Sequence, residues 1–293
     1  MQLFSGFSMF TVLLLMALGL AIVFGLMGVI NMAHGELMAM GAYITYLTAT
    51  LFERWAPQWM GGYLAVAIML AFLGTFAFGY VLERGFIRHF YNRPLDTMLA
   101  TWGLSLILQQ LYRSLFGPQE VSVPLPGWLA GAWQPVDGVQ LPLARIFIVG
   151  LTIAVAAAVY LLLYRSRWGL RVRAITQNRA MSGAVGINTG RVDALTFALG
   201  SGLAGIAGCV FTLIGSTNPG TGQLYIVDSF VVVVFGGVQS LIGTVWSAFL
   251  IAQSQSALEY MVSGAMAKLA ILFCVIATLY VRPQGLFSYK GRA

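Results

Sequence analysis

The sequence predicts an all-α fold, a polytopic transmembrane bundle of about eight to ten helices. Of its residues, 59% are hydrophobic and only 9% are charged, whereas a soluble domain carries roughly 25% charged residues. Apolar stretches of about 20 residues, enough to cross roughly 30 Å of hydrocarbon, recur along the chain. No polar segment between them is long enough for a separate soluble domain, so we expect one transmembrane domain over residues 1–293.

Nine apolar segments are candidate membrane helices. Several are short or interrupted by glycine, and we expect some of these to be half-helices buried against protein, where irregular backbone survives at membrane depth. The region 225–260 is also compatible with a helical hairpin, which leaves the count open. In chain order the segments are Phe7–Ile30, Leu37–Phe52, Tyr63–Leu82, Thr97–Phe116, Leu143–Tyr164, Ala194–Gly215, Tyr225–Val238, Leu241–Tyr260 and Ala265–Val281.

The basic residues orient these segments, because cytoplasmic loops are enriched in Lys and Arg. The loop 165–193 carries six arginines and one acid, and the loop 117–142 carries no Lys or Arg but contains Glu120 and Asp137. We therefore place the first loop in the cytoplasm and the second outside. Further basic residues mark the cytoplasmic side at Arg84, Arg88, Arg93, Arg282, Lys290 and Arg292.

Nine spans then place the N-terminus outside and the C-terminus in the cytoplasm. Residues 1–8 lack the basic region that begins a cleaved signal peptide, so we expect the first span to be retained. The net charge of +7 is explained by this loop bias better than by nucleic-acid binding, since the basic residues lie at loop ends.

Several classes of chemistry find no support in the sequence. Cys209 and Cys274 lie in apolar segments and are expected to pack there, and with His34 and His89 they show no metal-binding spacing. No GxxxxGK[ST] motif occurs, so the usual phosphate-binding loop is missing. If ATP drives this protein, another polypeptide binds the ATP and its magnesium.

The segment 31–43 contains the first candidate site. A helix here would place Asn31, His34 and Met38 on one face, with Glu36 off that face. Ionisable groups in a bilayer usually face a cavity or a partner, so Asn31 and His34 could line a polar path or fix a helix break. Alternatively, His34 and Glu36 lie at the membrane interface, where water reaches them, and serve only folding.

Two further polar residues are candidates for the path. Asp228 precedes an apolar run, where it could mark a solute or ion site or cap a helix N-terminus; we favour the cap. Gln239, with Gln109, Gln110, Gln253 and Gln255, could suit a neutral polar solute, although hydrogen bonding between helices is the commoner use. The small residues of the segment 200–208 favour tight packing within the subunit over a subunit interface.

The interior of the basic loop, Thr176–Ile187, is predicted to form a short helix that ends at a glycine. An exposed short helix of this kind can dock into another protein. A chain with such a helix and no nucleotide site is expected to be one part of a machine whose other parts are soluble.

A family resemblance is carried by motifs spread from about residue 8 to the C-terminus. They are Ile30–Glu36 with Gly41–Tyr43, Thr176–Met181, Arg191–Gly205, Tyr225–Phe230, Val234–Gly237, and Arg282–Phe287 with Lys290–Arg292. On these residues the chain resembles the permease subunits of bacterial ABC importers of the branched-chain amino acid type, and most closely their urea-permease branch. Ala180–Ser182 departs from the family's Glu-Ala-Ala, and Gln239 stands where that branch has glycine.

The resemblance implies a multi-pass protein of the bacterial inner membrane that works with several partners. These are a second permease subunit, two cytoplasmic ATPases that hold ATP and magnesium, and an extracytoplasmic solute-binding protein. The loop 165–193 would contain a coupling helix that docks on an ATPase, and its candidate residues are Gln177, Asn178, Arg179, Ala180, Met181, Ala184 and Gly186.

The expected function is ATP-driven import of urea or a similar small neutral amide. The alternatives are import of branched-chain amino acids by the same kind of permease and passive conduction of urea by a channel, which would need no docking loop. A membrane enzyme is disfavoured because no nucleophile–base pair or metal set is legible, and a secondary transporter because few intramembrane acids are available to couple an ion.

Overall fold

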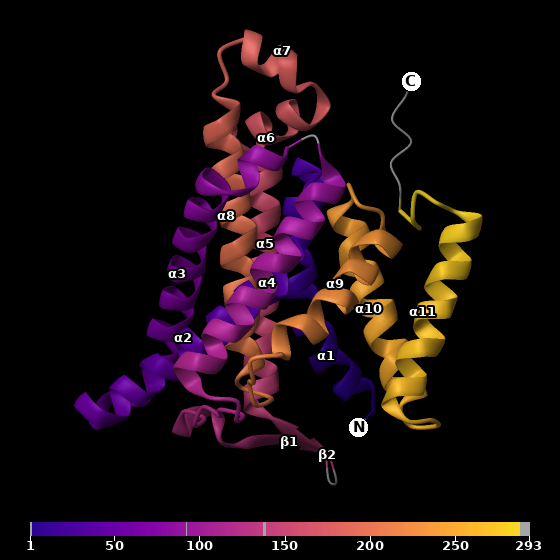
Figure 1. Ribbon diagram of the computed structural model, residues 1–293. Coiled ribbons are helices and arrows are strands. Elements are labelled where there is room, and N and C mark those ends of the chain that lie inside the picture. Colours follow the sequence, from indigo (N-terminus) through magenta and orange to yellow (C-terminus); the bar gives the residue numbers. More distant parts are fainter. Residues whose placement is uncertain (1, 92, 137–138, 288–293) are drawn as a thin grey trace.

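The computed structural model describes residues 2–91, 93–136 and 139–287 (Figure 1). Within these residues the chain forms eleven α-helices and one two-stranded antiparallel sheet, so the prediction of an all-α bundle is confirmed. Asp137, Lys290 and Arg292, which supported the predicted topology, lie outside the described residues.

The helices follow the predicted segments closely, because each apolar run forms a helix that ends where polar residues, Gly or Pro begin. The N-terminal helix continues through a wider π-helical turn, η1, and then ends. In order the elements are α1 (Gln2–Leu20), η1 (Ala21–Leu26), α2 (His34–Trp55), η2 (Pro57–Trp59), α3 (Tyr63–Gly85), η3 (Ile87–Phe90), α4 (Pro94–Phe116), η4 (Gly127–Leu129), β1 (Ala132–Val136), β2 (Val139–Pro142), α5 (Leu143–Arg165), α6 (Arg167–Gln177), α7 (Arg179–Ala184), α8 (Thr189–Phe211), α9 (Thr221–Gly236), α10 (Leu241–Leu258) and α11 (Gly264–Val281).

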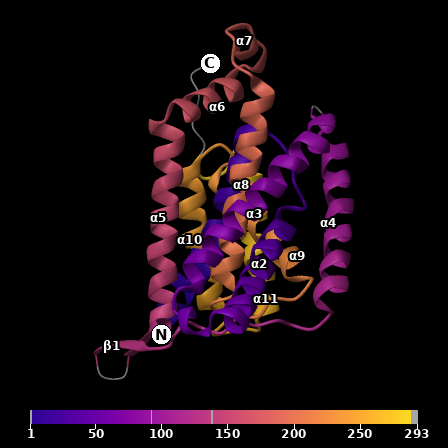
Figure 2. The ribbon, with the colours of Figure 1, turned by 90° about the vertical axis from the view of Figure 1, so that its left-hand side faces the viewer.

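Five helical stretches are long and apolar enough to cross a membrane, namely α1 with η1, α3, α5, α8 and α11. The helix α9 is apolar but shorter, and α2 and α4 carry charged residues near their ends. The helices α6 and α7 lie at one end of the bundle and the β1–β2 hairpin at the other (Figure 1). Figure 2 shows α5 and α4 at opposite edges of the molecule.

The helix α8 occupies the centre, and most of its residues between Val192 and Val210 are buried. Its glycines bring other backbones close. A Cβ atom added to Gly200 would lie 2.7 Å from the Gly19 oxygen of α1, and one added to Gly205 would lie 2.6 Å from the Ala71 oxygen of α3. The small residues of this segment therefore pack inside the subunit, as favoured from the sequence.

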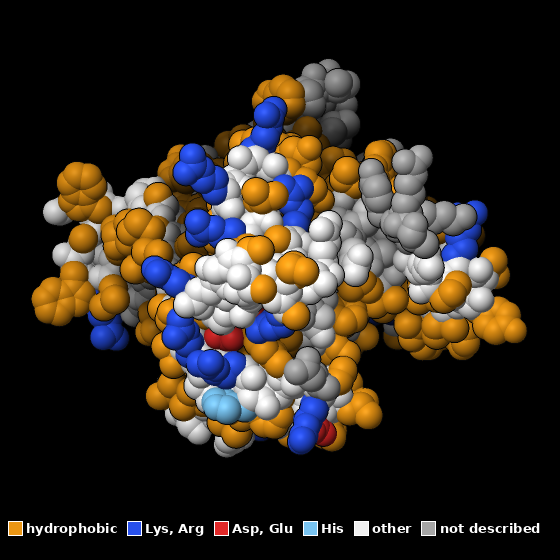
Figure 3. All heavy atoms as spheres, turned by 90° about the horizontal axis from the view of Figure 1, so that it is seen from above, with side chains coloured by type: hydrophobic (Ala, Val, Ile, Leu, Met, Phe, Trp, Pro, Cys, Tyr) orange, Lys and Arg blue, Asp and Glu red, His pale blue; other side chains and the backbone are white. Residues whose placement is uncertain are grey.

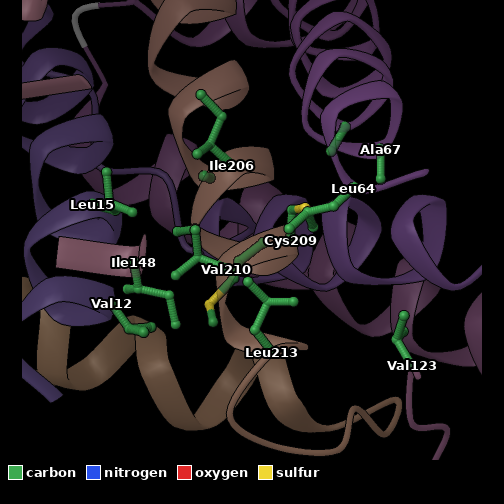
Figure 4. Close-up of a cluster of buried hydrophobic side chains, with 14 of the residues drawn as sticks. Val12, Leu15, Leu64, Ala67, Val123, Ile148, Ile206, Cys209, Val210 and Leu213 are labelled. Atoms are coloured by element: carbon green, nitrogen blue, oxygen red, sulfur yellow. The ribbon is translucent and has the colours of Figure 1, made fainter. Parts of the chain in front are cut away.

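The largest buried cluster surrounds the same helix (Figure 4). Side chains from α1, α3 and α5 meet Ile206, Cys209 and Val210 of α8, and Val123 from the segment after α4 closes one side. Cys209 packs as predicted. Cys274 is exposed on α11, so the prediction of a packing role within the subunit is wrong for this residue.

The helix α2 begins inside the bundle and not at its edge. The Nε2 atom of His34, its first residue, lies 3.3 Å from the Met16 backbone oxygen of α1. Met16 lies midway along the candidate membrane span Gly6–Leu26, about 15 Å from either end at a rise of about 1.5 Å per residue. The prediction of a helical face that includes Asn31 is wrong, because Asn31 precedes the helix and its Oδ1 accepts from the Ala33 amide at 3.0 Å.

The segment between α4 and the hairpin is tied to the turn between α8 and α9. Val121 and Thr217 exchange backbone hydrogen bonds of 2.8 and 2.9 Å. The Glu120 carboxylate accepts hydrogen bonds from Ser216 and Asn218, which lower the pKa of Glu120. Residues from both halves of the sequence therefore close this end of the bundle together.

Adding one methyl group at the centre of α8 should destabilise the fold. In Gly208→Ala the new Cβ would collide with the Met38 backbone oxygen of α2, and we expect a loss of about 1–3 kcal/mol in the free energy of unfolding. The measurement is the thermal unfolding midpoint of the purified protein in detergent. The matched control is Gly150→Ala on α5, where a Cβ meets no atom within 4 Å; equal midpoints for the two variants would contradict the central role of α8.

Candidate functional site

The protruding end of the molecule is built from α6 and α7, and the sequence fixes where each begins. The Ser166 hydroxyl accepts from the Gly169 amide at 3.0 Å and caps α6, and the Asn178 side chain accepts from the Met181 amide at 2.9 Å and caps α7. Gly186 ends α7 with φ +86, a conformation that glycine adopts without strain. The short helix ending at a glycine is confirmed, although Thr176 and Gln177 belong to α6, a helix that the sequence did not predict.

All seven residues predicted for coupling are exposed: Gln177, Asn178, Arg179, Ala180, Met181, Ala184 and Gly186. Two large apolar side chains project from this tip, Met181 at 61% exposure and Val185 at 69%. An exposed apolar tip on a polar protrusion is suited to docking into a groove of a partner. That these residues contact an ATPase stays a prediction.

The tip is joined to the bundle through Arg179. Its guanidinium donates to the Asp193 carboxylate of α8 at 2.6 Å and lies 5.2 Å from the ring centroid of Tyr91. The Tyr91 hydroxyl donates to Glu83 of α3 at 2.6 Å. Burial raises the pKa of Tyr91, and the hydrogen bond to Glu83 raises it further, so the phenol keeps the proton that it donates. Arg179 of α7 is thus bonded directly to α8 and linked to α3 through Tyr91.

Among the charged side chains at this end of the molecule, basic ones are in the majority (Figure 3). The acids Glu83 and Asp193 are buried, at 1% and 4% exposure, so the exposed charges are mainly those of arginine. This matches the predicted cytoplasmic side, while the side of the membrane that it faces stays a prediction.

Gln239, one of the predicted path residues, lies at the same end. It is exposed in the turn between α9 and α10 and lines a cavity of about 420 Å³ together with Gly28, Tyr91 and Arg179. The structure therefore places Gln239 beside the anchor of α7 and separates it from the other path candidates.

Asn31, His34 and Met38 are all fully buried within the chain. Water does not reach His34 or Glu36, so the interpretation that both lie at a wetted interface is wrong. Asn31 caps the backbone before α2, which agrees with a role in fixing a helix break, and His34 contacts α1. A path role for these three residues stays a prediction, and in this structure none of them reaches the surface.

Asp228 lies in the middle of α9, so its predicted role as a helix cap is wrong. The helix begins four residues before Tyr225, at Thr221, which the apolar run alone did not indicate. The Asp228 carboxylate accepts from Lys268 of α11 at 2.8 Å, and the two side chains are 20% and 47% exposed. This ion pair joins the peripheral helix α11 to α9.

A polar cluster that the sequence did not predict surrounds Glu36. Glu36 Oε1 accepts from Ser105 Oγ at 3.1 Å and from Gln109 Nε2 at 2.9 Å, both on α4, and the Tyr112 hydroxyl donates to the Glu36 backbone oxygen at 2.9 Å. The available signal was a carboxylate inside an apolar segment. Its partners are on another helix, far away in the sequence, and no local spacing points to them.

The described residues contain no group of three or more His, Cys, Asp or Glu side chains placed to hold a metal ion. The sites found are surfaces and hydrogen-bonded clusters, and the comparisons with known proteins agree with a transport role. Residues 2–279 match the family described as branched-chain amino acid transport system, permease component. No solved structure gives a significant match.

Curated relatives cover nearly the whole chain. It is 31% identical to the high-affinity branched-chain amino acid transport system permease protein BraD of Pseudomonas aeruginosa, over 98% of this chain and 95% of the relative. It is 27% identical to the corresponding protein LivH of Escherichia coli K12, over 98% and 94%. These relatives are transport permeases and not enzymes. The chain therefore belongs to the family of permease components of branched-chain amino acid transport systems.

Proposed function

We propose that this chain is one of two permease subunits in an ABC importer that carries branched-chain amino acids across the bacterial inner membrane. The observation that carries this proposal is the exposed α7 tip, joined by the Arg179–Asp193 ion pair to the central helix. A permease that partner ATPases drive needs a docking element that is joined to its transmembrane core. A passive channel has no use for it.

The solute is assigned from the relatives. Their names specify branched-chain amino acids, and none of these names supports the urea expected from the closer family resemblance. We therefore assign branched-chain amino acids as the solute. Urea is the alternative, and the transport assay distinguishes the two.

The mechanism follows from the connections of α7. ATP and magnesium bind in the two partner ATPases, whose closure moves the docked α7. Arg179 passes that movement to Asp193 on α8 and, through Tyr91, to Glu83 on α3. Since α1, α2 and α3 pack against the glycines of α8, the helices move together, and the two permease subunits alternate between outward-open and inward-open states. A solute-binding protein delivers the solute at the β1–β2 end.

The test is solute uptake by proteoliposomes that contain this chain, its partner permease and the ATPases, with binding protein outside and ATP inside. Leucine uptake that requires every component supports the proposal. Uptake of urea in place of leucine would show that the assigned solute is wrong. Flux through this chain alone would show that the protein is a channel and not an importer.

Polar substitution at the α7 tip should weaken ATPase docking. We expect Met181→Asp to lower the affinity of the permease for its ATPase by about tenfold or more, because a docked apolar side chain contributes strongly at an interface centre. Affinity is measured by titrating ATPase onto the permease in nanodiscs. The matched control is Met261→Asp, at 80% exposure in the turn between α10 and α11 at the opposite end; an equal loss there would contradict docking at α7.

Breaking the anchor should separate ATP hydrolysis from uptake. Arg179→Met leaves the buried Asp193 carboxylate without its cation, which is costly, and loosens α7 from α8. We expect at least a fivefold drop in leucine moved per ATP hydrolysed. The double variant Arg179→Met with Asp193→Asn removes the unpaired charge and should recover stability but not coupling. Unchanged coupling in both variants would show that the ion pair transmits no movement.

A further inference from the structure

The cluster around Glu36 has no part in ATPase docking, and its composition is unusual for a membrane interior. It forms where the first turns of α2 and α9 meet α4. Gly35 and Gly222 pack backbone to backbone there, which brings Gln223 of α9 next to Gln109 of α4. Glu36 itself lies two residues after His34, and therefore close to mid-membrane depth.

One oxygen of the Glu36 carboxylate lacks a partner. Oε1 accepts from Ser105 and Gln109, whereas Oε2 is buried and accepts no hydrogen bond from any described group. A buried acceptor without a donor costs free energy, and an ionisable group at this depth indicates a functional site with a specific partner. The structure thus holds an unused, strong acceptor.

No cation of the described chain balances Glu36. Ion pairs elsewhere in the described residues join Arg93 with Asp96, Arg179 with Asp193, and Lys268 with Asp228. His34, in the same helical turn, is directed to the Met16 oxygen of α1. The N-terminus of α2 carries a partial positive charge, which favours a negative charge at Glu36. It does not supply a full cation.

Gln109 and Gln223 connect Glu36 to the surface. Gln109 Nε2 donates to Glu36 Oε1 and approaches Gln223 Oε1 at 3.4 Å. Glu36 is fully buried, Gln109 is partly exposed and Gln223 is exposed. The Gln109 amide nitrogen thus lies between two acceptors, Glu36 Oε1 and Gln223 Oε1. A ligand with several N–H groups can take its place and donate to both. Val227, one turn after Gln223 and 53% exposed, offers adjacent apolar surface.

We propose that Glu36, Gln109 and Gln223 form a transit site for the ammonium group of an amino-acid solute. The ammonium displaces Gln109 Nε2, donates to Glu36 and Gln223, and supplies the cation that Glu36 lacks, while the hydrocarbon side chain contacts Val227. The covered carboxylate of this structure is the unloaded state of the site. The amino-acid solute rests on the proposed function, whereas the attraction of a cation to Glu36 can be measured without transport.

The transport arm of the test uses the complete reconstituted importer. Glu36→Gln keeps the size of the side chain and removes its charge, and Gln223→Leu removes the outer acceptor. We expect each to lower leucine uptake per ATP hydrolysed by about tenfold, as charge-assisted hydrogen bonds are strong. The matched control is Gln110→Leu on the exposed side of α4, which should retain uptake within about twofold of the unmodified assembly.

A second arm separates failure of this site from failure of the proposed function. In a Cys274→Ser background, Gln223→Cys is treated with methanethiosulfonates bearing either an ethylammonium or a sulfonate group. With Glu36 present, the cationic reagent should react about tenfold faster than the anionic one, and Glu36→Gln should remove that preference. At Gln110→Cys, the ratio of the two reaction rates should be the same with and without Glu36.

The outcomes are distinct. Absence of leucine uptake by the unmodified assembly overturns the proposed function, while a Glu36-dependent reagent preference still supports a cation site. Normal uptake by Glu36→Gln and Gln223→Leu, or a reagent preference that survives Glu36→Gln, overturns the site. Ser105→Ala tests whether Glu36 has a purely structural role, because it removes the Ser105 hydrogen bond to Oε1 and leaves Oε2 intact. If this variant loses as much uptake as Glu36→Gln, with the same fall in unfolding temperature, the proposal is overturned.

Discussion

The glycine faces of α8 let three neighbouring helices bring their backbones into contact with it, and the other features of the molecule depend on this close approach. Lipid offers helices no hydrophobic drive to associate, so packing of small residues holds such bundles together. Gly200, Gly205 and Gly208 place α1, α3 and α2 around one axis. With these three positions fixed, α2 can begin within the bundle, covered by protein on the sides that lipid would otherwise reach.

A helix that begins at membrane depth exposes backbone amides that must be satisfied locally. The Asn31 side chain accepts from the Ala33 amide, and Thr101 of α4 accepts from the Met32 amide. The first turn of α9 meets this break through Gly35 and Gly222. The irregular backbone and the buried carboxylate of Glu36 are therefore two aspects of one arrangement, in which polar chemistry is possible only because the surrounding helices exclude lipid.

The same central helix connects this region with the protruding end. Asp193 lies in the first turns of α8 and holds Arg179 of α7, and the later turns of α8 hold α2 through Gly208. The tip is thus anchored to the helix around which the others pack. Basic residues surround the tip, while the acids beneath it are buried, so the anchor joins a half-exposed arginine to a buried carboxylate.

Length, hydropathy and turn residues act locally along the chain, so they were enough to predict the membrane class, the nine apolar segments and the exposed helix that ends at Gly186. The small residues in α8 likewise indicated their packing role. The partners of Glu36, Asp228 and Arg179, in contrast, depend on how distant helices pack. Glu36 meets Gln109 across 73 positions and Asp228 meets Lys268 across 40, so no periodicity relates them. Whether a polar residue in such a bundle caps a helix, pairs with a charge or stays unpaired depends on which distant helix packs beside it.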